Sequence, residues 1–175
     1  MAAGAASLEW GGVSNFGSSL AGLDLYHVGL VVPELESAMD AYGQLFGFEW
    51  ATVGPPRIQH VVVGGERRDA EIVVTYSVQG PPHLELIEER SGGVWAAESP
   101  LNHVGFWAPD LADAVARLTN AGFPAMVHDI GGGDRDPARS SVFSYHPIAG
   151  GFWMELVGIG FQSQLQAWIA SSAES

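Results

Sequence analysis

The stretch LYHVGLVVPELESAMDAYGQLFGF at residues 25–48 decides the fold, because a diverged copy, LNHVGFWAPDLADAVARLTNAGF, follows at residues 101–123. At an offset of 76 the two stretches share the identities Leu25/Leu101, His27/His103, Val28/Val104, Gly29/Gly105, Pro33/Pro109, Leu35/Leu111 and Ala38/Ala114. A Gly-Phe pair closes each copy. The same residue types in the same order over so short a window indicate a duplicated structural module.

Each copy has the pattern of a strand followed by a helix. The strands are expected at 25–32 and 101–108, and Pro33 and Pro109 end them because proline cannot donate to a continuing ladder. Apolar residues at helical spacing follow each proline.

Three extended segments then follow in each copy, separated by turns rich in glycine and proline. They are expected at 48–53, 70–78 and 83–89 in the first copy, and at 123–129, 140–145 and 152–158 in the second. Residues 58–63, IQHVVV, either extend the second strand or form an additional one. The sequence therefore predicts an α+β fold built from two tandem βαβββ modules.

The chain divides into five predicted parts. These are an N-terminal arm (1–22), a first module (23–89), a linker (90–100), a second module (101–158) and a C-terminal helix (159–175). The helix is expected because large apolar residues recur at helical spacing in FQSQLQAWIASS.

The composition excludes several classes of function. Hydrophobic residues make up 47% of the 175 residues, which is enough for a substantial core. The absence of cysteine rules out a disulfide framework, a cysteine-ligated metal and a thiol nucleophile. The net charge of -13, with no lysine, disfavours nucleic acid and anionic membranes as partners. With no apolar run of spanning length and no secretory signal pattern, we expect a cytoplasmic protein.

Two polar residues in each module occupy strand positions where apolar residues are the norm. His27 and His103 lie in the first strand of each module, and Glu85 and Glu155 lie in the last one. Each carboxylate needs a partner, because an unpaired buried carboxylate is strongly destabilising. Equivalent positions of a duplicated fold can converge on its pseudo-twofold axis. Imidazole with carboxylate suits a divalent metal such as Zn, Ni, Co, Mn or Fe.

These residues also carry a resemblance to a known family. The segments HVGLVVPEL (27–35), HVGFWAPDL (103–111) and YHPIAGGFWMELVG (145–158) resemble the vicinal oxygen chelate superfamily. That superfamily includes glyoxalase I, methylmalonyl-CoA epimerase, extradiol dioxygenases and bleomycin-binding proteins. The resemblance implies a curved, partly closed mixed sheet around a central metal site, with one divalent ion held by His27, Glu85, His103 and Glu155.

The resemblance implies catalytic groups as well. Glu71 falls where one group of epimerases places a catalytic base, although Arg67 and Arg68 nearby leave open that it is an exposed strand residue. Glu155, beside the metal, is the other candidate base. The expected substrate-binding residues are Tyr145, Trp107, Trp153 and His83.

Three functions fit this pattern. The first is a metal-dependent isomerase, epimerase or lyase that removes a proton α to a carbonyl, from a neutral or apolar small molecule with adjacent oxygens. The second is an Fe(II) extradiol-type dioxygenase, against which Glu85 weighs as a fourth ligand. The third is a non-catalytic, drug-sequestering protein. A homodimer is the expected assembly.

Overall fold

The computed structural model describes residues 20–90, 93–96, 101–130 and 142–172. The predicted N-terminal arm therefore lies almost entirely outside the described residues, as does part of the predicted linker. No helix in the described part of the chain is long and apolar enough to cross a membrane.

The element order repeats itself along the chain. The first half contains β1 (Asp24–Val32), α1 (Leu35–Phe46), β2 (Arg57–Val63), β3 (Glu66–Ile72), β4 (Val74–Tyr76) and β5 (His83–Glu88). The second half contains β6 (His103–Ala108), α2 (Leu111–Asn120), β7 (Val127–Asp129), β8 (Phe143–Pro147) and β9 (Trp153–Gly158). Two short 3-10 helices, η3 (Ala149–Gly151) and η4 (Ile159–Phe161), flank β9, and α3 (Gln162–Ser172) follows.

Both repeated helices begin just after the proline that ends the preceding strand. The side chain of Glu34 accepts a hydrogen bond from the backbone N–H of Ser37, and Asp110 accepts one from Asp113 in the same way. Each acidic residue thus satisfies a free N–H group in the first turn of its helix, which fixes where the helix starts.

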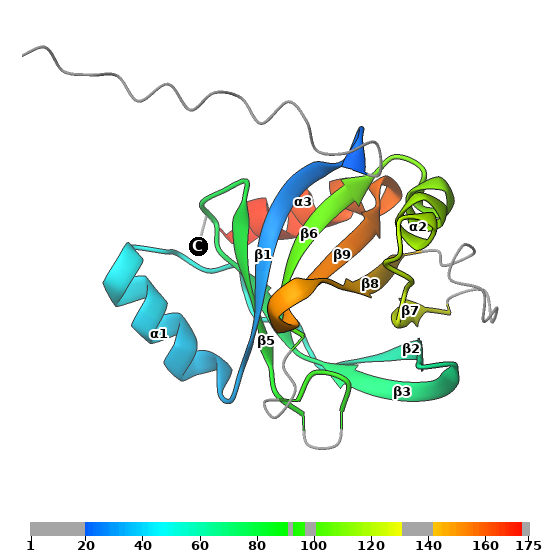
Figure 1. The fold of residues 1–175 in the computed structure, drawn as a ribbon. Helices are drawn as coiled ribbons and strands as arrows, with labels where there is room; N and C mark the ends of the chain where they lie inside the picture. The colour runs from blue at the N-terminus through cyan, green and yellow to red at the C-terminus, as the bar shows by residue number, and fades with distance from the viewer. Residues whose placement is uncertain (1–19, 91–92, 97–100, 131–141, 173–175) are drawn as a thin grey trace, which may run out of the picture.

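The described strands form one mixed sheet in the order β3-β2-β7-β8-β9-β6-β1-β5-β4. The two repeated first strands, β1 and β6, pair antiparallel at its centre, and each pairs in parallel with the last strand of its own half, β5 or β9. The sheet curls into a half-barrel (Figure 1), which confirms the predicted α+β fold of paired βαβββ units. Its outermost strands, β3 and β4, are separated in the chain by Val73 alone, so the curl brings the two ends of the sheet together.

The middle of the first half differs from the prediction. Residues 48–53 contribute only an isolated bridge, between Trp50 and Ser77. Residues 57–72 instead form the β2–β3 hairpin, which pairs with β7 of the second half. The additional strand at 58–63 was one of the two alternatives, but its partner lies far away in the sequence, where no local pattern indicates the pairing.

The helices cover both faces of the curved sheet. On one face, α1 packs Leu35 against Leu86 of β5, and α2 packs Leu118 against Leu156 of β9. On the other face, α3 buries Leu165 in the main core cluster. The strand residues of this cluster alternate along the chain with those that pack under α1 and α2, so they point to the opposite face of the sheet. In Figure 1, α3 crosses behind β1 and β6, whereas α1 and α2 flank the sheet. The concave face is therefore covered by the C-terminal helix.

Candidate metal centre

Four polar side chains meet at the centre of the curved sheet. His27 and His103 project from the paired central strands β1 and β6, and Glu85 and Glu155 project from the neighbouring strands β5 and β9. All four residues are buried, and one ligand-type atom of each lies within 4.8 Å of the others. One chain thus brings together the four residues that the repeat singled out, in a group that could hold a metal ion.

The distances between the donor atoms test whether they fit an ion. Nε2 of His27 lies 2.8 Å from Nε2 of His103, 3.3 Å from Oε2 of Glu85 and 3.1 Å from Oε2 of Glu155. Nε2 of His103 lies 3.0 Å and 3.5 Å from the same two oxygens. Metal bonds of roughly 2.1 Å place adjacent ligand atoms roughly 3.0–3.4 Å apart, so the spacing and the donor set fit a first-row divalent metal.

Two glycines make room for the histidines. Across the antiparallel pair, His27 stands opposite Gly105, and His103 stands opposite Gly29. A Cβ at Gly105 would lie 1.9 Å from Cε1 of His27, and a Cβ at Gly29 would lie 2.0 Å from Cε1 of His103. Only glycine therefore lets each imidazole lie across the neighbouring strand. The glycine of each His-Val-Gly motif thus makes room for the histidine of the other module.

A backbone contact fixes the orientation of one imidazole. Nδ1–H of His103 donates to the carbonyl oxygen of Leu101 at 2.7 Å. In the neutral imidazole this hydrogen bond keeps the proton on Nδ1 and directs Nε2 at the centre, as a metal-binding histidine requires.

The carboxylates control the protonation of His27. Burial alone would lower the pKa of His27, but the charge of Glu85 and the hydrogen bonds with Glu155 and Glu85 raise it to about 9. Burial would raise the pKa of Glu85, but His27 and His103 hold it well below its usual range. The metal-free site therefore carries a proton on His27 that a bound metal would displace.

Each carboxylate also contacts a tyrosine on the adjacent strand. The Tyr76 hydroxyl donates to Oε1 of Glu85, and Tyr145 makes a side-chain hydrogen bond with Glu155. The two pairs are equivalent, since each tyrosine stands directly opposite its glutamate in the strand register. Burial, followed by the carboxylate charges, raises the pKa of both tyrosines well above 10, so both phenols stay protonated donors.

Sequence reasoning singled out Tyr145 but missed Tyr76. The signal for Tyr76 was the repeat itself, because each tyrosine precedes its glutamate by nine or ten residues with a glycine-containing turn between them. A tyrosine in an apolar strand is otherwise typical of core packing, which is why Tyr76 attracted no attention.

A cavity of about 290 Å³ opens beside the four residues. Its wall includes the carboxylates of Glu85 and Glu155 and the phenols of Tyr26, Tyr76 and Tyr145. The other apolar lining residues are Ile72, Val74, Val142, Phe143, Val157, Phe161 and Trp168. The other polar ones are Arg57, Gln59 and Gln164. The cavity thus offers a small space with aromatic and aliphatic walls that reaches the two candidate carboxylate ligands.

Glu71 lies away from this cavity. It projects outward from the edge strand β3, with its side chain 44% exposed and ion-paired at 2.9 Å to Arg90. Strand residues alternate between faces, and the neighbouring Ile72 is the one that lines the cavity. A catalytic base must reach the substrate, so the expectation that Glu71 is the base is corrected on geometric grounds.

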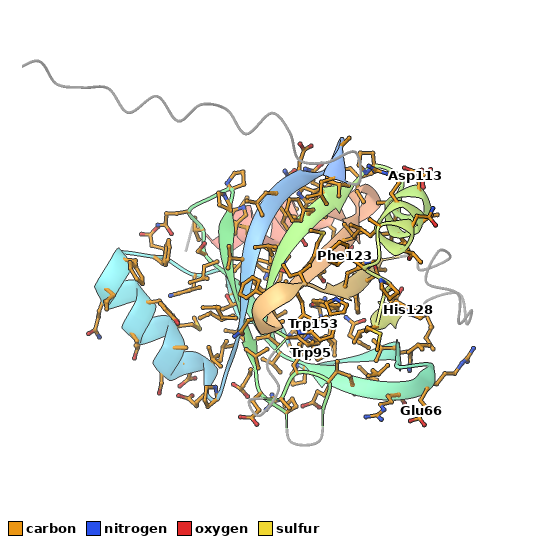
Figure 2. The ribbon with its side chains drawn as sticks, in the orientation of Figure 1. Glu66, Trp95, Asp113, Phe123, His128 and Trp153 are labelled. Atoms are coloured by element: carbon orange, nitrogen blue, oxygen red, sulfur yellow. The ribbon has the colours of Figure 1, made fainter. Side chains whose placement is uncertain are left out.

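The other expected substrate-binding residues are also outside the cavity, apart from Tyr145. Trp107 stacks on Tyr26 with 3.8 Å between ring centroids, and His83 binds the carbonyl of Ser77 through Nδ1. Both line a separate cavity of about 160 Å³. Trp153, labelled in Figure 2, packs against the main core cluster.

Comparison with known families gives one match. The model of the glyoxalase/bleomycin resistance protein/dioxygenase superfamily matches residues 26–140, a stretch that contains three of the four candidate ligands. No curated protein sequence matches the chain significantly.

Solved structures with a similar fold come from several bacteria. A hypothetical protein from Bacillus halodurans C-125 aligns with a TM-score of 0.50 and 10% identity, over 78% of this chain and 94% of its own. Methylmalonyl-CoA epimerase from Mycobacterium tuberculosis aligns with a TM-score of 0.49 and 20% identity, over 77% and 86%. A mutant 4-hydroxymandelate synthase from Streptomyces coelicolor aligns with a TM-score of 0.49 and 14% identity, over 87% of this chain and 54% of its own. At these identities the likeness concerns the fold alone.

Proposed function

The chain belongs to the glyoxalase/bleomycin resistance protein/dioxygenase superfamily, and from that premise we propose that it is a metal-dependent isomerase, epimerase or lyase. Its substrate is a small molecule with two adjacent oxygens. The observation that carries the proposal is the buried group of two histidines and two glutamates beside a cavity. Four buried ionisable side chains in one place are costly to maintain for packing alone.

His27, Glu85, His103 and Glu155 are the residues that hold the metal in this proposal. When bound, a divalent ion supplies Lewis acidity for substrate oxygens and so stabilises negative charge that develops there. Tyr76 and the backbone carbonyl of Leu101 keep Glu85 and His103 in place through the hydrogen bonds described above.

We assign proton abstraction to Glu155. A base must reach the cavity, and Glu85 and Glu155 are the carboxylates that line it. Of these two, Glu155 is the candidate base that the family resemblance implies. Glu155 takes the proton from the carbon α to the carbonyl and returns it to the product.

The cavity walls complete the site. Phe143, Val157 and Trp168 place apolar surface next to the carboxylates, which strengthens electrostatic interactions there. The neutral phenol of Tyr145 forms a hydrogen bond with Glu155 and so holds this carboxylate at the cavity wall.

The same geometry separates this proposal from its two rivals. An extradiol-type dioxygenase uses three protein ligands and leaves positions open, but Glu85 is fixed on both oxygens by Tyr76, His27 and His103. A protein that only sequesters a ligand has no need for a buried proton-binding group, and we therefore rank both rivals lower.

Elemental analysis of untagged protein tests the metal. We expect about one Zn, Ni, Co or Mn per chain in the wild type, and loss of it in His27→Ala and in His103→Ala. His60→Ala is the matched control, because His60 is an exposed strand histidine paired with Asp69. Equal metal content in all variants contradicts the ligand assignment.

Solvent exchange tests the reaction. A panel of α-hydroxyketones and 2-substituted carbonyl compounds is incubated in D2O and followed by proton NMR. Wild-type protein should accelerate loss of an α-proton signal for at least one class, and Glu155→Gln should abolish the acceleration. Iron in the protein together with O2 uptake on catechols would instead favour the dioxygenase.

A further inference from the structure

One arginine of the described chain stands apart from the others. Arg68, Arg90 and Arg117 each form an ion pair with an acidic side chain. For the side chain of Arg57, the structure shows no ion pair or hydrogen bond with any of the described residues. Arg57 lies on β2 at the rim of the cavity beside the candidate metal ligands. Since none of the described side chains pairs with this guanidinium, it can bind a ligand.

Arg57 lies where two cavities adjoin. Besides the cavity of about 290 Å³, it lines a second space of about 200 Å³. Phe161, Gln164 and Trp168 of the C-terminal region line both spaces as well. A ligand that extends from the first space into the second therefore passes Arg57 and these residues.

Trp168 is held firmly above this passage. Its indole N–H donates to the carbonyl oxygen of Thr52 at 2.9 Å, and its ring meets Tyr76 edge-on with 5.6 Å between centroids. Leu165 and Ile169, on the same helix, are buried in the main core cluster. The indole is therefore a fixed aromatic wall and not a surface side chain that happens to lie nearby.

Size and charge restrict what this passage accepts. A space of about 290 Å³ is at the small end for organic ligands, so the inner part takes one or two rings and little more. Arg57 is the one cationic side chain among the described residues lining it, and two carboxylates lie at its inner end. A ligand that bears several phosphate groups would find too few cationic side chains here to bind them, whereas a single carboxylate can pair with the one guanidinium.

We propose that the cavity selects a compact aromatic monocarboxylate, whose carboxylate binds Arg57 at the rim and whose ring packs against Trp168. The oxygen-bearing end of the ligand then faces Glu85 and Glu155. This inference rests on the proposed function for the reactive end only. The recognition by Arg57 and Trp168 does not need a metal.

The test measures binding of 2-naphthoate and its methyl ester to metal-free protein by isothermal titration calorimetry. We expect wild-type protein to bind the carboxylate at least about tenfold more tightly than the ester, as a charge-assisted hydrogen bond provides. Arg57→Gln should remove this preference and leave ester binding unchanged. Arg68→Gln, on the neighbouring strand and outside the cavity, should retain it. Equal affinities in wild type, or a preference that survives Arg57→Gln, would overturn the proposal.

Two further measurements complete the test. Trp168→Ala should weaken both the acid and the ester about tenfold without changing their ratio, since it removes the ring contact and not the charge contact. Acetyl-CoA should bind more weakly than 2-naphthoate, and tighter binding would refute the charge argument. Because these titrations use metal-free protein, an absence of metal in the purified protein would refute the proposed function while leaving the naphthoate result standing.

Discussion

Replacement of Gly105 by alanine tests the reciprocal packing of the two modules. The added Cβ would lie 1.9 Å from Cε1 of His27, whereas ordinary contacts begin at 3.4 Å. The imidazole must therefore retreat by about 1.5 Å, the difference between these distances. Metal–ligand distances tolerate deviations of only about 0.2 Å, so His27 is lost as a ligand.

The size of the effect follows from this displacement. Loss of a hydrogen-bonding neighbour of a ligand already costs about 10–100-fold in metal affinity, so loss of a ligand should cost more than about 100-fold. Forcing extra volume into a packed site should also lower the free energy of unfolding by about 1–3 kcal/mol. Gly160→Ala is the control, because a Cβ at Gly160 meets no atom within 4 Å.

A double-mutant cycle provides the sharper assay. Urea unfolding of Gly105→Ala is compared in the wild-type background and in a His27→Ala background, with metal removed. Gly105→Ala should lower the free energy of unfolding by about 1–3 kcal/mol when the His27 imidazole is present and by close to zero when it is absent. The reason is that the imidazole is the group with which the new methyl group overlaps. Equal penalties in both backgrounds, or normal metal binding by Gly105→Ala, would refute the proposed fit between Gly105 and His27.

Four other outcomes are expected. Tyr76→Phe should lower metal affinity about 10–100-fold in calorimetric titrations by removing the donor to Glu85, while Tyr42→Phe on α1 leaves it unchanged. The raised pKa of His27 stabilises the metal-free protein fully below pH 6.5, and this contribution is lost as the pH rises through about 9, so the urea midpoint should fall over that interval. Leu165→Ala should destabilise the fold by about 2–5 kcal/mol in urea melts, because Leu165 is 2% exposed, whereas Leu45→Ala at 68% exposure should change it by less than about 0.5 kcal/mol. Light scattering after gel filtration should give twice the chain mass of 18.5 kDa, and the mass of a single chain would refute the expected homodimer.

The repeat made the central part of the fold predictable. His27 and His103 occupy equivalent positions, and equivalent positions in two like modules are related by the same pseudo-symmetry that pairs β1 with β6. Strand ends at proline and helix starts at acidic caps are likewise local effects, which a sequence pattern reveals.

Features that depend on distant pairing were not predictable in this way. The β2–β3 hairpin joins β7 of the other half, so its place in the sheet depends on residues far along the chain. The direction of Glu71 depends on the register of that hairpin, because a shift by one residue exchanges the two faces of a strand. The position of Arg57 at the cavity rim likewise depends on where the hairpin lies in the fold.

The charged run of β3 has a consequence for how the protein behaves among its own copies. This strand, ERRDAEI, lies at one end of the sheet order, and one side of its backbone has no strand partner among the described residues. Such an edge is a template for association with another chain, and charged side chains such as those of this strand oppose it. Figure 2 shows Glu66 at the far end of this hairpin, distant from the centre of the molecule. Glu71, which the sequence suggested as a catalytic base, thus belongs with Arg67 and Arg68 to a charged strand that disfavours edge-to-edge aggregation.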